Sequence, residues 1–209
     1  MNIIFVFFLG LIFALIGVIP PGLLNMTAAK ISLKEGYSRG IMFSVGVCVT
    51  VLIQTYIAAI FARYLSNHQD VIDILQRIAF VVFILIAIYF LFIAKKKPKL
   101  NVASNIKSKH SRFFYGMFLA SINTLPIPYQ AYMTTTLASL GWMNFEHTTI
   151  YSYVLGVATG TFIMLYVYIL SFEKIKGKKF TSQKSMNYSI GAIAGIIALI
   201  TLYNILKEL

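Results

Sequence analysis

"GVIPPGLLNMTAAK" occupies residues 17–30, at the end of the first long apolar segment, and places Pro20, Pro21 and Gly22 where a membrane-spanning helix would continue. A proline removes one backbone donor and clashes with the carbonyl group one turn earlier, so the pair interrupts the helix. In lipid, freed polar groups persist only where protein or a water-filled cavity satisfies them. The stretch therefore predicts a broken helix whose break lines an internal site.

The composition indicates an integral membrane protein. Of the 209 residues, 59% are hydrophobic and 11% are charged, and the mean hydropathy is +0.81. Residues 1–29 carry no charged side chain and lack the basic start and cleavage site of a secretory signal, so they are interpreted as a retained span. The net charge of +12 lies in loops between apolar segments. Membrane orientation explains it better than nucleic-acid binding does.

Apolar runs long enough to cross a hydrocarbon core, which takes about 20 helical residues, recur along the chain. Six spans are predicted, at 3–29, 41–62, 74–94, 113–138, 148–170 and 186–206. The first, third and fifth loops together carry 15 Lys and Arg residues, whereas the second and fourth carry 2. By the positive-inside rule the odd loops are predicted to be cytoplasmic, with both termini outside.

The predicted fold is all-α, with two inverted three-helix repeats at 1–94 and 113–209 joined by a basic cytoplasmic linker at 95–112. Three spans in each half force the second half to enter the membrane with the opposite orientation, as in many secondary transporters. A break in the first span of one half should then have a counterpart in the other. "NTLPIPYQ" at 123–130 supplies it, with Pro126 and Pro128, so the first and fourth spans are both predicted to be broken.

Two facing breaks predict a substrate site near the bilayer midplane. A freed helix N-terminus attracts an anion and freed carbonyl groups accept from an ammonium group, and a zwitterionic amino acid presents both. Proline kinks also occur in membrane helices without any ligand. The candidate substrate-binding residues lie at or beside the breaks, with one inward-pointing glutamine in the second span: Pro21, Gly22, Asn25, Thr27, Gln54, Asn123, Thr124, Pro126, Pro128, Tyr129 and Gln130.

The spacing of Pro21-Gly22, Gly36, Gly40 and Gly46 resembles that of the LysE/RhtB superfamily of amino-acid exporters. In the second half, "FFYGMFLASINTLPIP" (113–128) is similar to the family's aromatic-x-x-Gly segment that leads to an Asn-Pro break. The resemblance implies a multi-pass protein of the bacterial inner membrane that exports amino acids by alternating access. The sequence departs from the family pattern at Leu23, Ser44 and Thr50-Val51.

The acidic residues, histidines and cysteine of the chain bear on functions other than export. All six acidic residues are predicted outside the spans, so no buried carboxylate supports proton coupling: Glu35, Asp70, Asp73, Glu146, Glu173 and Glu208. The three histidines also fall in predicted loops, and the single cysteine, Cys48, excludes an internal disulfide and a cysteine metal cluster. No enzyme activity and no cofactor are therefore predicted. A transporter of another small solute, such as a metal or organic ion, remains the alternative.

The expected partners are the lipid bilayer and a small-molecule substrate, with no nucleic acid. Gly191 and Gly195 form a GxxxG motif in the last predicted span. That motif is typical of a helix contact within one subunit or between two. The motif is therefore compatible with a homodimer.

Overall fold

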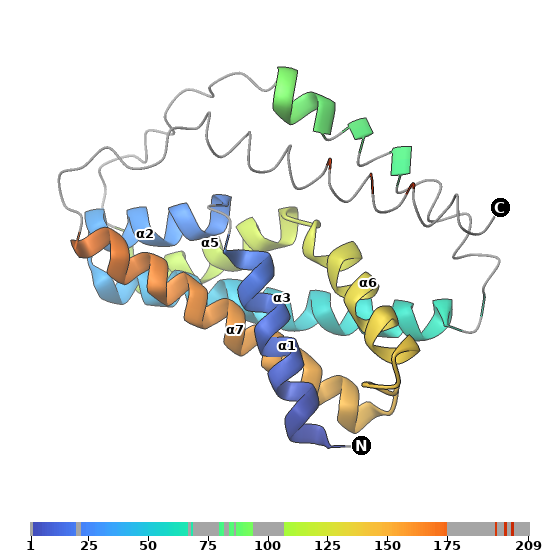
Figure 1. Ribbon diagram of the computed structural model, residues 1–209. Helices are drawn as coiled ribbons and strands as arrows, with labels where there is room; N and C mark the ends of the chain where they lie inside the picture. Colours follow the sequence, from blue (N-terminus) through green and yellow to red (C-terminus); the bar gives the residue numbers. More distant parts are fainter. Residues whose placement is uncertain are drawn as a thin grey trace. The chain divides into compact units, whose positions relative to one another are not determined.

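The computed structural model describes residues 2–19, 22–66, 68, 80–81, 84–85, 87–93, 107–174, 195, 199 and 202. Within these residues it contains six α-helices, one π-helical segment and no strand: α1 (Ile3–Val18), α2 (Leu23–Glu35), α3 (Tyr37–Leu65), η1 (Tyr89–Ile93), α5 (Lys109–Ile122), α6 (Pro126–Ser139) and α7 (His147–Lys174) (Figure 1). The predicted all-helical class is confirmed for this part of the chain.

The chain divides into two compact units. One consists of Met1–Ser66 with Ser104–Lys178, and the other of Asn67–Ala103 with Lys179–Leu209. The six α-helices with the bounds given above belong to the first unit, and η1 belongs to the second, together with further described helical residues at 80–81, 84–85 and 87–88. The predicted spans 74–94 and 186–206 fall in the second unit. The first lies partly and the second mostly outside the described residues.

Helices α3 and α7 are long and apolar enough to cross a membrane. They correspond to the predicted spans 41–62 and 148–170. Helices α1 and α2 form a third candidate span if the bent pair is counted as one. The predicted span 113–138 is covered by two shorter helices, α5 and α6. At 1.5 Å per residue each of these reaches only about 21 Å, so neither crosses a bilayer alone.

Local sequence explains where several helices begin and end. Asn2 Oδ1 accepts from the backbone N–H of Ile4 at 3.0 Å and thereby caps α1. Pro126 occupies the first position of α6, where a missing N–H costs nothing. Helix α2 ends at Gly36, whose φ of +103° strains any residue with a side chain.

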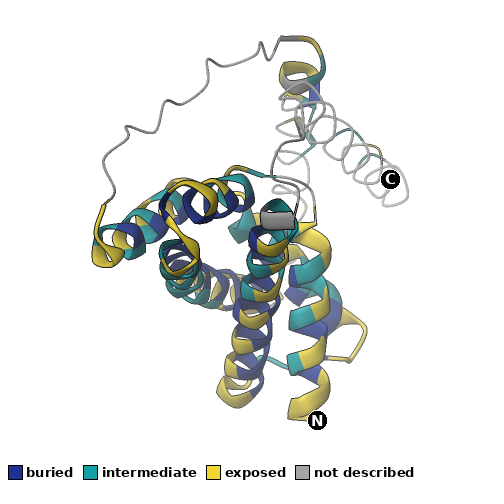
Figure 2. Ribbon diagram, turned by 90° about the vertical axis from the view of Figure 1, so that its left-hand side faces the viewer, coloured by how far each residue is buried: buried dark blue, intermediate teal, exposed yellow. Residues whose placement is uncertain are grey.

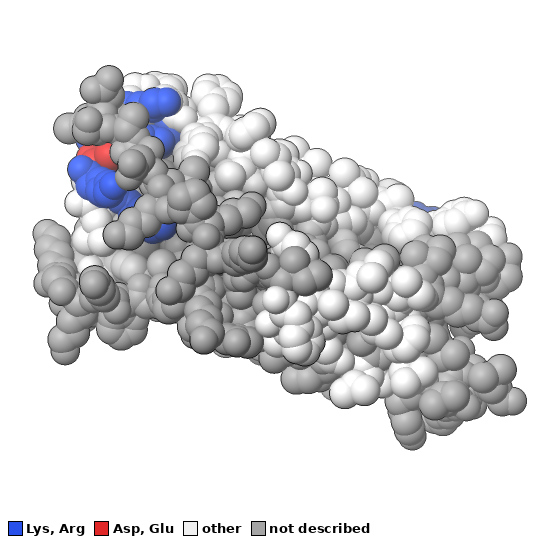
Figure 3. Space-filling view, turned by 90° about the horizontal axis from the view of Figure 1, so that it is seen from above, with Lys and Arg blue, Asp and Glu red and all other residues white. Residues whose placement is uncertain are grey.

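The junction between α2 and α3 corrects the predicted loop at 30–40. Helix α2 continues through Glu35 and α3 starts at Tyr37, so a single glycine separates them. The end of α2, the start of α3, the start of α5 and the end of α7 lie at the same end of the first unit (Figure 1). Lys and Arg side chains gather at one end of the described surface (Figure 3).

Glycines let two pairs of helices approach until their backbones touch. At the α1–α7 crossing, a methyl group on Gly156 would overlap the carbonyl oxygen of Phe7, and one on Gly10 would overlap that of Tyr153. At the α3–α5 crossing, Gly46 faces the carbonyl oxygen of Phe113 in the same way. Gly116 faces that of Phe43. Both crossings therefore depend on residues without a side chain.

The two crossings are built from the same sequence patterns. "FFLGL" at 7–11 in α1 matches "FFYGM" at 113–117 in α5, and "FSVGV" at 43–47 in α3 matches "YVLGV" at 153–157 in α7. At each crossing, the glycine of one segment packs on the backbone carbonyl group of the aromatic residue that begins the facing segment. The two halves of the chain thus share an aromatic-x-x-Gly pattern in addition to the paired prolines.

Exposed residues lie along the outward faces of these helices and buried residues face inward (Figure 2). Many of the exposed residues are large and hydrophobic, while the buried residues are both apolar and polar. Large hydrophobic residues such as Phe8, Ile53, Phe118 and Leu155 are about half exposed. The core packs around fully buried Phe43 and Tyr153. An apolar exterior over a partly polar interior is the pattern expected of helices surrounded by lipid.

Candidate functional site

The first interruption separates two helices whose axes differ by 80°. Helix α1 ends at Val18 and α2 begins at Leu23. Pro20 and Pro21, which were predicted to cause the break, lie outside the described residues. Gly22 is half-buried and precedes α2 without a side-chain hydrogen bond to the first turn. The N-terminal N–H groups of α2 are therefore not capped by a side chain at Gly22.

Carbonyl groups at the end of α1 accept hydrogen bonds from the protein's own side chains. Asn25 Nδ2 donates to the Val18 carbonyl at 2.8 Å, and the Tyr168 hydroxyl donates to that of Ile19 at 2.7 Å. Asn25 is buried on α2, whereas Thr27 on the same helix is half-buried. Tyr168 comes from α7 and was not among the predicted residues. These bonds satisfy carbonyl groups that the interruption of the helix leaves free.

The second interruption lies between α5 and α6. Asn123 ends α5 and is half-buried, Thr124 is exposed, and α6 begins at half-buried Pro126. Pro128 is exposed in the first turn of α6. Leu125 precedes the helix and makes no side-chain capping bond. Of the residues predicted around this break, Thr124 and Pro128 are therefore the most exposed.

Gln54 connects α3 to the second interruption. Its Nε2 donates to the carbonyl groups of Ala120 and Asn123, both at 3.1 Å. The side chain is buried, which confirms that it points inward as predicted. Its Oε1 is buried and has no hydrogen-bond partner in the described part of the chain, and the same is true of Thr55 Oγ1. Because an unsatisfied buried acceptor is costly, Gln54 Oε1 is the most conspicuous free polar group of the site.

Tyr129 and Gln130, just after the second interruption, reach α1 and α7. The Tyr129 hydroxyl donates to the Phe13 carbonyl at 3.0 Å, and its ring lies where a side chain on Gly17 would touch it. Gln130 is buried and its Oε1 accepts from the Tyr153 hydroxyl at 2.7 Å. Tyr129 thus brings the start of α6 against the last turns of α1, so the two interruptions are linked by a direct contact.

Comparison with known proteins places the chain in a family. The model of the LysE type translocator matches residues 15–205. The chain belongs to the LysE type translocator family. LysE type translocators move small solutes across membranes and are transporters rather than enzymes. No curated protein and no solved structure matches the chain significantly.

The glycines that carried the predicted LysE resemblance have physical roles in this translocator. Gly36 adopts a positive φ at the α2–α3 junction. A side chain on Gly40 would meet Ser32 of α2. Gly46 and Gly116 form the α3–α5 crossing described above. These four glycines therefore occupy positions where backbone geometry or packing excludes a side chain.

The LysE translocator buries an ion pair that the sequence did not reveal. Glu35 and Arg112 were both predicted in loops, but Glu35 is the last residue of α2 and Arg112 lies in the first turn of α5. Their side chains are only 6% and 5% exposed. The prediction that no acidic residue is buried in the helices is therefore wrong at Glu35. Among the described residues no group of three or more His, Cys, Asp or Glu could hold a metal ion.

Proposed function

We propose that this LysE type translocator exports amino acids or related small zwitterionic metabolites from the cytoplasm by alternating access. The observation that carries this proposal is Gln54 Oε1, a buried acceptor without a partner in the described residues, held beside the interrupted helix by bonds from its own Nε2. An ammonium group is a suitable donor for this oxygen. The site is then completed by substrate.

The other end of a zwitterion suits the start of α2. Helix α2 begins at Gly22 without a side-chain cap. The first turn of α6 offers fewer donors, because Pro126 and Pro128 have no N–H and the Ile127 N–H donates to the Thr124 carbonyl at 3.1 Å. Uncapped N–H groups and the positive end of the helix dipole favour a carboxylate. The contact of Tyr129 with α1 supports a shared location for the two interruptions. We assign Pro21, Thr27, Thr124, Pro126 and Pro128 to the surroundings of this site on their position in the sequence.

We further propose that the two halves form inverted three-helix repeats. The support is the pairing of "FFLGL" with "YVLGV" at one crossing and of "FFYGM" with "FSVGV" at the other. Each crossing joins the first helix of one predicted half to the helix of the second predicted span in the opposite half. Such exchange is expected of two similar units related by a two-fold axis in the membrane plane.

Cells that express the protein and are fed dipeptides are expected to accumulate less free amino acid than cells without it. Pro126→Ala should weaken this effect, because α6 would lose its defined start beside the site. Pro98→Ala, in the basic linker, serves as the matched control and should export normally. Measurement of intracellular amino-acid pools tests the proposal. Unchanged pools of every amino acid, with transport of an organic ion in a vesicle panel, would favour the alternative substrate class.

A reporter that is active only in the cytoplasm is expected to be silent when it is fused to the C-terminus. The reason is the charge distribution, since the three basic loops should remain on the cytoplasmic side. A fusion at residue 103, within the basic linker, is the positive control and should be active. A bright C-terminal fusion together with a silent linker fusion would invert the proposed topology.

A further inference from the structure

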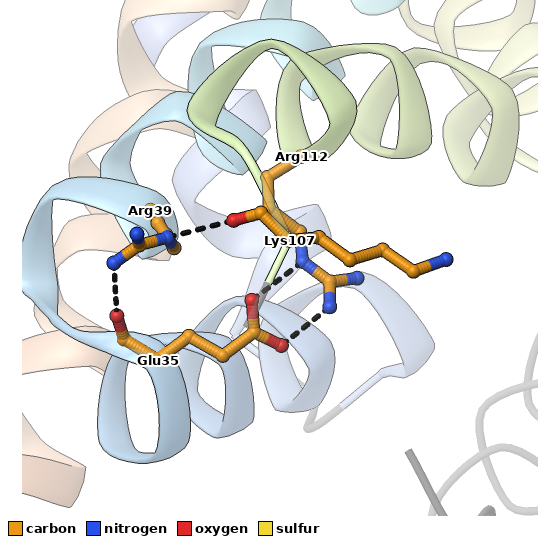
Figure 4. Close-up of polar contacts among 4 residues, drawn as sticks. All are labelled: Glu35, Arg39, Lys107 and Arg112. Atoms are coloured by element: carbon orange, nitrogen blue, oxygen red, sulfur yellow. Dashed lines mark hydrogen bonds and ion pairs between the residues drawn. The ribbon is translucent and has the colours of Figure 1, made fainter. Parts of the chain in front are cut away.

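Glu35 and Arg112 join the two predicted halves of the chain at the end of the unit where the basic residues lie. Arg112 Nε donates to Glu35 Oε2 at 2.7 Å, and Arg112 Nη2 pairs with Glu35 Oε1, so the guanidinium binds the carboxylate with two parallel bonds (Figure 4). The guanidinium also lies 5.6 Å from the ring centre of Tyr115. This geometry fixes α2 against the start of α5.

Arg39, at the start of α3, forms hydrogen bonds beside the same ion pair. Its Nη1 donates to the Glu35 carbonyl at 2.7 Å, and its Nε donates to the Lys107 carbonyl at 2.8 Å (Figure 4). It therefore ties the α2–α3 junction to the segment that leads into α5. Lys34 and Lys109, by contrast, are exposed and lie within one helical turn of Glu35 and Arg112 in the sequence.

The helices that carry the ion pair also lead to the proposed substrate site. Helix α2 runs from Gly22 at the first interruption to Glu35, and α5 runs from Arg112 to Asn123 at the second. At 1.5 Å per residue, each path is roughly 16–20 Å long. That is more than half the thickness of a hydrocarbon core about 30 Å thick. The ion pair therefore joins α2 to α5 at one end of these helices. The proposed substrate site lies at their other end, beside the two interruptions.

We propose that Glu35 and Arg112 form a gate that breaks and re-forms as the transporter opens and closes its basic end. This inference rests on the proposed alternating-access function. A buried ion pair gains little net stability, because desolvation of both charges offsets their attraction. Opening returns both charges to water, so the closed and open states lie close in free energy. Removing one partner prevents closure, because the other charge would remain buried alone.

The opposite end of the unit is closed differently. There the rings of Phe5, at the start of α1, and Trp142, after α6, lie 6.2 Å apart in an edge-to-face contact. By the proposed repeat, this place corresponds to the ion pair at the basic end. An apolar contact at one end and an ion pair at the other make the two closures chemically distinct, so the basic end alone should respond to charge neutralisation.

The gate can be tested by cysteine labelling of the full-length protein in lipid nanodiscs, without any substrate. In a Cys48→Ala background, Ser32→Cys reports on the buried face one turn from Glu35, and Thr149→Cys reports on a buried position near the start of α7. Arg112→Gln is expected to increase the maleimide labelling rate at position 32 by about tenfold or more. Labelling at position 149 should not change. Glu35→Gln combined with Arg112→Gln should restore slow labelling.

Lys34→Gln is the matched control, since it removes an exposed charge next to Glu35 and should leave both rates unchanged. If Arg112→Gln does not elute as a folded species, Arg112→Lys replaces it and should increase labelling at position 32 more weakly. Equal acceleration at positions 32 and 149 would show general loosening and would overturn the gate, as would an unchanged rate at position 32. Failure of amino-acid export alone would leave these labelling results intact, so the two proposals can fail separately.

Discussion

Gly46→Ala is expected to destabilise the folded protein by about 3 kcal/mol, the upper part of the usual range for overpacking a tightly packed position. The added methyl group would occupy the place of the Phe113 carbonyl oxygen, close to the backbone N of Met117. Backbone atoms of a neighbouring helix cannot rotate away as a flexible side chain can, so α3 and α5 would have to separate. Separation would also withdraw the bonds from Thr50 and Gln54 to α5.

Thermal unfolding of the purified protein in detergent, followed by the fraction that stays monodisperse, measures this effect. Gly195→Ala is the matched control, because in the described part of the chain no atom outside its own stretch of helix lies within 4 Å of the place that its methyl group would take. Its helix should be unaffected or slightly more stable, since alanine favours helix by up to about 1 kcal/mol over glycine. Equal melting temperatures for Gly46→Ala and the unmodified protein would contradict the close crossing.

The parts of the architecture that depend on local pattern could be predicted from the sequence. Long apolar runs predicted α3 and α7, and the glycine spacing around Gly36 and Gly46 predicted the confirmed family. Burial of Gln54 followed from the cost of leaving an amide in lipid. The binding roles of Gln54 and the other candidates stay predictions, and Pro21 lies outside the described residues.

The contacts that could not be predicted join residues far apart in the chain. Glu35 and Arg112 lie beside apparently loop-like basic segments, so counting charges assigned both to solvent, whereas the packing of α2 on α5 buries them together. In the sequence, Tyr168 and Tyr153 are ordinary aromatic residues of an apolar helix. In the structure, the Tyr168 hydroxyl donates to the Ile19 carbonyl and the Tyr153 hydroxyl donates to Gln130 Oε1. No local periodicity encodes such pairings, because they depend on which helices touch.

Gln54→Leu is expected to combine a loss of stability with a loss of transport. It removes the donor that satisfies the carbonyl groups of Ala120 and Asn123, and two lost hydrogen bonds correspond to about 2 kcal/mol. It also removes Oε1, the acceptor proposed for the substrate ammonium group, so the initial transport rate in reconstituted vesicles should fall by about tenfold or more. Melting temperature and vesicle transport, measured on the same preparation, report the two effects independently.

Thr55→Val removes a buried polar atom that makes no hydrogen bond. Comparing it with Gln54→Leu therefore isolates the effect of losing the hydrogen bonds that Gln54 makes. Thr55 is adjacent to Gln54 and equally buried, but its hydroxyl oxygen has no partner among the described residues, so valine of similar shape should not reduce stability. A melting temperature that falls as far in Thr55→Val as in Gln54→Leu would show that the bonds from Gln54 to α5 contribute little. A Gln54→Leu protein with unchanged transport would remove Gln54 from the substrate site, because that proposal requires its oxygen to bind the substrate directly.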